Sequence, residues 1–143
     1  MKQIGLLMLG ILAGLFMACA PAAGGASKTV AISPIGSLSS GATSQVAGTA
    51  TISADSPKSK VTVSLRGLEP NSKHAGHLHV GTCSAVGPVA VGLNVITADA
   101  NGNGSSTTEV DTAKLAGAYV AYHQRGPDDA NGIGSFIACG EIN

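Results

Sequence analysis

Short segments in which apolar and polar residues alternate follow one another along most of the chain. In residues 45–53 (QVAGTATIS) and 60–68 (KVTVSLRGL), apolar side chains recur at every second position. This is the period of a β-strand that buries one face and exposes the other to solvent. Between such segments the chain is rich in Gly, Pro, Asn and Asp, which favour turns. From residue 29 onward the pattern therefore predicts an all-β domain.

Further β-prone segments complete the set, and they lie at residues 74–80, 87–100, 105–110, 118–123 and 135–142. The segment NGNG at 101–104 predicts a tight hairpin turn, because Asn and Gly tolerate the positive φ that such turns need. No convincing amphipathic helix is present, although DTAKLAG at 111–117 is compatible with one helical turn. With about eight antiparallel strands and no internal repeat, the economical fold is a single Greek-key β-sandwich or barrel.

The first residues have the layout of a bacterial export signal, since Lys2 precedes an uncharged apolar run over 4–17. As a helix this run would be about 21 Å long, shorter than the roughly 30 Å hydrocarbon core of a membrane. The segment LFMAC resembles a lipobox, in which the signal is removed just before a cysteine that receives lipid. We therefore expect residues 1–18 to be a lipoprotein signal peptide and Cys19 to carry the lipid. The alternative, cleavage after ACA, would leave Pro21 at the new N-terminus, which ordinary signal peptidase tolerates poorly.

The expected mature protein is an exported lipoprotein of the bacterial cell envelope, anchored to the membrane through Cys19, with its domain outside the cytoplasm. Residues 19–28 have the composition of a flexible tether, and residues 29–143 form the predicted domain. The chain carries eight Lys and Arg against eight Asp and Glu, and it has no Trp, two Tyr and two Phe. Because this composition offers neither a basic surface nor a stacking platform, no nucleic-acid partner is expected.

The segment KHAGHLHVGTC at 73–83 holds three of the four histidines in the chain. On an extended strand His77 and His79 project to the same face, which is a common way to offer two imidazoles to one metal ion. His123 supplies a further imidazole at the end of the segment AYVAYH. His74 would face the opposite way on a regular strand, so we expect it to be a structural histidine. The alternative for His77 and His79 is that they are merely solvated, and for His123 that it is only a hydrogen-bonded polar residue.

One cysteine, Cys83, ends the histidine-rich segment at 73–83. If Cys19 is lipidated, Cys83 and Cys139 remain as a pair in a compartment where disulfides persist. A bridge between them would stabilise the fold by roughly 4 kcal/mol in the chain-entropy model. The alternative is two free thiols.

Three segments carry a resemblance to the copper/zinc superoxide dismutases. VSLRGLEPNSKHAGHLHVGTCSAVGPV resembles the strand, turn and His-x-His segment of that family. AYHQRGPDD resembles the segment with its last copper histidine, and IACGEI resembles its C-terminal motif with the second disulfide cysteine. The similarity spans about residues 61–142, and the motifs occur in the family's order.

The resemblance implies a Greek-key β-barrel with a Cys83–Cys139 disulfide, and it places His74 where the family has a structural histidine. It also implies copper ligands at His77, His79 and His123.

The departures from the family concern its catalytic residues. The histidine that bridges copper and zinc should lie six residues after the first disulfide cysteine, where this chain has Val89. No histidine occurs between Val80 and Tyr122, so the zinc ligands are missing too. The arginine that guides superoxide to copper is replaced by Phe136, and Arg125 is the remaining candidate for a positive charge near His123.

The segment HLHVGTCSAVGPVAVGL is also similar to the chordin-type domain. The sequence therefore leaves three functional hypotheses. The first is an envelope lipoprotein that binds copper through three histidines, with weak or no dismutase activity. The second is a copper-only superoxide dismutase, and the third is a chordin-like structural or adhesion module without metal. Three neutral imidazoles suit copper, with zinc as the alternative ion.

Overall fold

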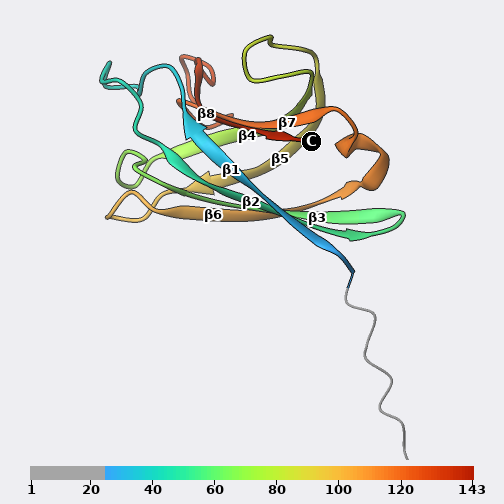
Figure 1. The fold of residues 1–143 in the computed structure, drawn as a ribbon. Helices are drawn as coiled ribbons and strands as arrows, with labels where there is room; N and C mark the ends of the chain where they lie inside the picture. The colour runs from blue at the N-terminus through green and yellow to red at the C-terminus, as the bar shows by residue number, and fades with distance from the viewer. Residues whose placement is uncertain (1–24) are drawn as a thin grey trace, which may run out of the picture.

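The computed structural model describes residues 25–143, in which the all-β prediction is confirmed (Figure 1). The expected signal peptide at 1–18 and the expected lipidation site Cys19 lie outside these residues. The strands are β1 (Ser27–Pro34), β2 (Ala47–Asp55), β3 (Lys58–Arg66), β4 (Lys73–Val80), β5 (Val89–Thr97), β6 (Gly104–Asp111), β7 (Ala118–His123) and β8 (Phe136–Ile142). Within the described part of the chain, no helix is long and apolar enough to cross a membrane.

The eight strands form one antiparallel sheet in the order β5-β4-β7-β8-β1-β2-β3-β6, which curls into a nearly closed barrel. The chain crosses from one side of the barrel to the other between β3 and β4 and again between β6 and β7, as a Greek key requires. Strand β1 joins the two sides, because its first part pairs with β2 and its end pairs with β8. In Figure 1 β4, β7 and β8 lie in the upper layer, and β2, β3 and β6 lie in the lower one.

The alternating apolar residues fill the inside of the barrel. On β3 the burial pattern alternates along the strand, with Val61, Val63 and Leu65 nearly inaccessible to solvent. Leu78 of β4 and Tyr122 of β7 lie in the same core. Removing these side chains from water is the main source of stability for a domain of this size.

Strand β1 begins at Ser27, within the segment expected to be a tether. Ser27 pairs with Ser53, and Lys28 pairs with Ile52. The backbone ladder with β2 therefore extends the domain beyond what the alternation of side chains indicated.

The segment NGNG does not form the tight hairpin that its composition predicted. Strands β5 and β6 flank it but pair with β4 and β3 respectively, so no ladder joins them. Side chains bridge this seam, since the amide of Asn94 donates to the carbonyl of Thr107 and its backbone N–H donates to Thr108 Oγ1. The loop itself is organised by Asp99, whose carboxylate accepts the backbone N–H groups of residues 101 and 103. The single helical turn was predicted correctly, as a 3-10 helix at Thr112–Leu115.

Candidate metal centre

Two paired strands bring three imidazoles to one place on the outside of the barrel. His77 and His79 of β4 pair with Ala121 and Tyr119 of β7, and His123 ends β7. One ring nitrogen from each of the three histidines lies within 4.8 Å of the other two. This is the only group of three or more potential metal ligands found in residues 25–143. The structure thus brings together the three histidines that the sequence singled out.

The rings are packed edge to face. The Nδ1 atom of His77 lies 3.2 Å from the Nε2 atom of His123. The ring centroid of His77 lies 5.6 Å from that of His79 and 5.1 Å from that of His123. Leu78, between the two β4 histidines, points into the barrel core with no exposed surface. A regular alternation of side chains therefore separates the core from the histidine cluster.

Hydrogen bonds to backbone carbonyls decide which ring nitrogens are free. His79 Nδ1 lies 2.9 Å from the carbonyl oxygen of Gly87, and His123 Nδ1 lies 2.8 Å from that of Gly134. A carbonyl only accepts, so both Nδ1 atoms must carry the proton, and the Nε2 atom of each neutral ring keeps its lone pair. Metal-binding histidines are usually oriented in this way, through a hydrogen bond from the nitrogen that does not coordinate.

The Nε2 atom of His79 is buried and has no hydrogen-bond partner, and it is the only such buried side-chain atom within the described residues. Leaving a buried polar atom unpaired costs about 1–3 kcal/mol, so such atoms are rare in folded proteins. A metal ion bound among the three nitrogens would satisfy this lone pair. The donor set, the ring orientations and the unpaired nitrogen therefore all fit a metal ion.

Burial also favours the neutral, metal-binding form of His77 and His123. Desolvation lowers the pKa of His77, and the neighbouring His123 and His79 lower it further. Desolvation likewise lowers the pKa of His123, partly opposed by its hydrogen bond to Gly134. A lower pKa means that the ring is neutral at neutral pH, which is the form that binds a metal.

Two aromatic rings pack against His79 and His123. Tyr119 stacks on His79, with ring centroids 5.2 Å apart and an interplanar angle of 15°. Phe136 presents its ring edge-on to both His79 and His123, at centroid distances of 5.1 and 4.6 Å. Tyr119 also belongs to a small apolar cluster outside the barrel, together with Ala121 and Cys139. The resemblance to the dismutases had placed Phe136 close to the copper ligands, but nothing in the sequence indicated that Tyr119 would stack on His79.

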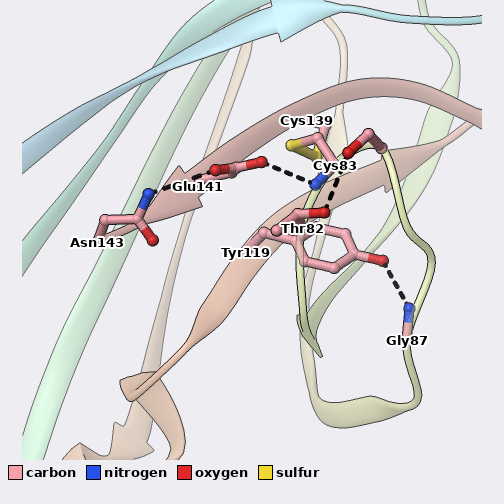
Figure 2. The surroundings of a disulfide bond; sticks show 8 residues. Thr82, Cys83, Gly87, Tyr119, Cys139, Glu141 and Asn143 are labelled. Atoms are coloured by element: carbon pink, nitrogen blue, oxygen red, sulfur yellow. Dashed lines mark hydrogen bonds between the residues drawn. A yellow bond between two sulfur atoms is a disulfide. The ribbon is translucent and has the colours of Figure 1, made fainter.

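The predicted disulfide between Cys83 and Cys139 is present, and it ties the loop at residues 81–88 to β8. The loop is also held by the N–H of Cys83, which donates to Glu141, and by the N–H of Gly87, which donates to the Tyr119 hydroxyl at 3.4 Å (Figure 2). A Cβ atom at Gly87 would collide with the carbonyl of Val80, so only glycine fits there. Because the loop is fixed at several points, the carbonyl of Gly87 is held where it accepts the hydrogen bond from His79 Nδ1.

His74, which the sequence analysis expected to be a structural histidine, lies inside the fold. It is fully buried, its Nδ1 lies 2.8 Å from the carbonyl oxygen of His123, and its Nε2 lies 2.6 Å from Ser72 Oγ. Burial lowers its pKa. Both ring nitrogens are already hydrogen-bonded, so His74 has no free nitrogen for a metal.

Val89, at the position of the bridging histidine, and Arg125, the candidate for a positive charge near His123, supply neither a ligand nor a free cation to the site. Val89 is 55% exposed and has no ligating atom. Arg125 forms an ion pair with Asp129 at 3.5 Å, and its guanidinium donates to the carbonyls of Gly132 and Asn131. The guanidinium of Arg125 is therefore paired with groups of its own loop and not with the histidine cluster.

Comparison with known proteins supports the fold. A Cu/Zn superoxide dismutase from Brucella abortus superposes on this chain with a TM-score of 0.56 at 23% sequence identity. The match covers 82% of this chain and 100% of the other. The chain has a superoxide dismutase-like fold. No protein-family model and no curated protein sequence matches it, and the similarity to the chordin-type domain gains no support.

Proposed function

We propose that this protein is an exported lipoprotein that binds a copper ion through His77, His79 and His123, with weak or no superoxide dismutase activity. The buried, unpaired Nε2 of His79 is the observation that carries the proposal. The coordinating atoms would be this nitrogen, Nε2 of His123 and Nδ1 of His77. The first two are selected by the hydrogen bonds from the opposite ring nitrogens to Gly87 and Gly134.

Copper is favoured over zinc by the donor set. Imidazole sites bind both ions, but affinity for divalent metals generally rises to a maximum at copper. The second, zinc-binding set of the dismutase pattern is missing, because residues 80–122 contain no histidine. One ion held by three neutral imidazoles is the arrangement that these residues can form.

Export and lipid anchoring are part of the proposal. The Cys83–Cys139 disulfide suits an oxidising compartment outside the cytoplasm. The apolar run at 4–17 and the lipobox-like LFMAC segment, with Cys19 as the lipidated residue, support a membrane anchor.

Low dismutase activity is proposed from the residues around the site. A bound copper ion would supply one-electron redox chemistry, but dismutation also needs a positive potential that draws superoxide in. Phe136 occupies the position of the guiding arginine and packs against His79 and His123. Val89 occupies the position of the bridging histidine and cannot exchange a proton.

Copper titration of the exported protein, purified in detergent, tests the proposal. We expect one tightly bound Cu(II) with nitrogen couplings in its electron paramagnetic resonance spectrum and little superoxide removal. His79→Ala should lower copper affinity more than a hundredfold, since even removal of an outer hydrogen-bond partner commonly costs ten- to hundredfold. Asp128→Asn is the control, because it removes an exposed carboxylate from outside the histidine cluster. Unchanged copper affinity in His79→Ala would refute the three-histidine site. Strong superoxide removal by the copper-loaded wild type would refute the low activity and show that the protein is a working dismutase.

A further inference from the structure

Tyr119 is fully buried although it lies on the outer face of the barrel. It belongs to the small apolar cluster outside the barrel, whereas Tyr122, on the same strand β7, packs inside the core. The loop at residues 81–88 covers Tyr119, because Cys83 packs against its cluster and Gly87 donates to its hydroxyl (Figure 2). The ring of Tyr119 is therefore held between the sheet and the loop.

Tyr119 contacts both His79 and the residue that hydrogen-bonds to His79. Its ring stacks on the imidazole of His79, with centroids 5.2 Å apart and an interplanar angle of 15°. Its hydroxyl accepts the N–H of Gly87 at 3.4 Å, and the carbonyl of the same glycine accepts the proton of His79 Nδ1 at 2.9 Å. Stacking restrains the plane of the imidazole, and the hydrogen bond restrains its direction within that plane. Tyr119 thus restrains His79 directly and through Gly87.

This restraint accounts for the unpaired nitrogen of His79. Its Nε2 atom is buried without a hydrogen-bond partner, which is unfavourable in a folded protein. A ring that turned freely would move Nε2 toward water or toward a donor. The stacked ring of Tyr119 and the carbonyl of Gly87 oppose that rotation, so the lone pair stays beside the nitrogens of the other two histidines.

We propose that Tyr119 is a positioning residue of the metal centre, which holds His79 in the metal-binding orientation, with its proton on Nδ1, before an ion arrives. The inference rests on the proposed copper site and adds a residue that the histidine motif does not include. A site whose ligands are already oriented binds more tightly, because binding does not have to order them. Tyr119 therefore raises the metal affinity without being a ligand.

Substitutions of the two tyrosines separate positioning from space filling. Tyr119→Leu removes both contacts, and Tyr119→Phe keeps the stacked ring but removes the hydroxyl. Tyr122→Leu and Tyr122→Phe are the matched controls, because Tyr122 is also fully buried on β7 but its hydroxyl contacts Ser106 and the carbonyl of Asn94. Heteronuclear NMR of the metal-free, full-length protein in detergent, at mildly alkaline pH, reports which nitrogen of His79 carries the proton. Cu(II) titration of the same protein reports the affinity.

We expect a single Nδ1–H tautomer of His79 in the wild type and both tautomers in Tyr119→Leu. Copper affinity should fall about ten- to hundredfold in Tyr119→Leu, as for other outer contacts of metal sites. It should fall about two- to tenfold in Tyr119→Phe, the value of one neutral hydrogen bond, and stay at the wild-type value in the folded Tyr122 variants.

A single Nδ1–H tautomer in Tyr119→Leu, or a copper affinity no lower than that of the Tyr122 variants, would overturn the positioning role. A wild type that binds no copper would instead refute the proposed function. The tautomer of metal-free His79 would still test Tyr119 in that case, so the two failures are distinguishable.

Discussion

The two ends of strand β4 carry buried histidines in opposite situations. His74, at the start of the strand, is fully buried and both of its ring nitrogens are hydrogen-bonded. His79, near the end, is 5% exposed and has one nitrogen bonded to Gly87 and the other unpaired. Burial alone therefore does not distinguish a structural histidine from a metal ligand. The difference is whether the surrounding chain satisfies both nitrogens.

The largest expected effect on stability follows from truncating the two histidines in turn. His74→Ala removes a buried ring and leaves the carbonyl of His123 without its donor, so we expect a loss of about 3 kcal/mol in the free energy of unfolding. His79→Ala removes one satisfied and one unsatisfied nitrogen, and we expect a loss of about 1 kcal/mol without metal. Denaturant titration in the presence of a chelator measures both. Equal losses would contradict the contrast between the two sites.

Added copper should stabilise the wild type but not His79→Ala. A ligand that binds only the folded state stabilises it, by about 2.7 kcal/mol at a concentration a hundredfold above the dissociation constant. We expect this gain in the wild type and none in His79→Ala. Thermal unfolding with and without Cu(II) measures the difference. A similar gain in His79→Ala would show that copper binds elsewhere.

A smaller effect is expected from the loop that orients His79. Gly87→Ala would place a Cβ atom against the carbonyl of Val80 and displace the carbonyl that holds His79. We expect copper affinity to fall about ten- to hundredfold, as for other second-layer contacts of metal sites. Gly92→Ala is the matched control, because a Cβ atom at Gly92 meets nothing within 4 Å. Equal copper affinities in the two variants would refute the orienting role of Gly87.

The smallest effect concerns pH. The pKa values of His74, His77 and His123 are all lowered in the folded state, mainly by burial. Below the ordinary pKa of about 6.5 the unfolded chain then binds more protons than the folded one, so stability is full above that pH and falls as the pH drops. Metal-free unfolding at pH 7.5 and 5.5 should show this fall, and His77→Ala should reduce it slightly. Stability that stays constant or rises on acidification would contradict the lowered pKa values.

Much of the fold followed from local patterns. The two-residue period of VTVSL placed β3 with its apolar residues in the core, and the same period placed His77 and His79 on one face with Leu78 on the other. The absence of a ladder between β5 and β6 was not predicted. The Asn and Gly residues of NGNG indicate that the backbone can turn there, but they do not indicate which strands pair. The pairing depends on how the whole sheet curls.

The sequence by itself determined that this chain makes short antiparallel strands, and it singled out the histidines and the cysteine pair. The strands and the shared face of His77 and His79 depend on alternation along one segment, which is a local property, whereas His123 and the Cys83–Cys139 pair were singled out by the few histidines and cysteines in the chain and by the resemblance to the dismutases. Only the tertiary structure decided that Gly87 and Gly134 orient two of the imidazoles, that Tyr119 and Phe136 enclose them, and that one nitrogen of His79 stays unpaired. The Gly87 and Gly134 carbonyls lie 8 and 11 residues along the chain from their histidines, and Tyr119 and Phe136 lie on other strands than His79, so none of these features follows from the alternation within one segment.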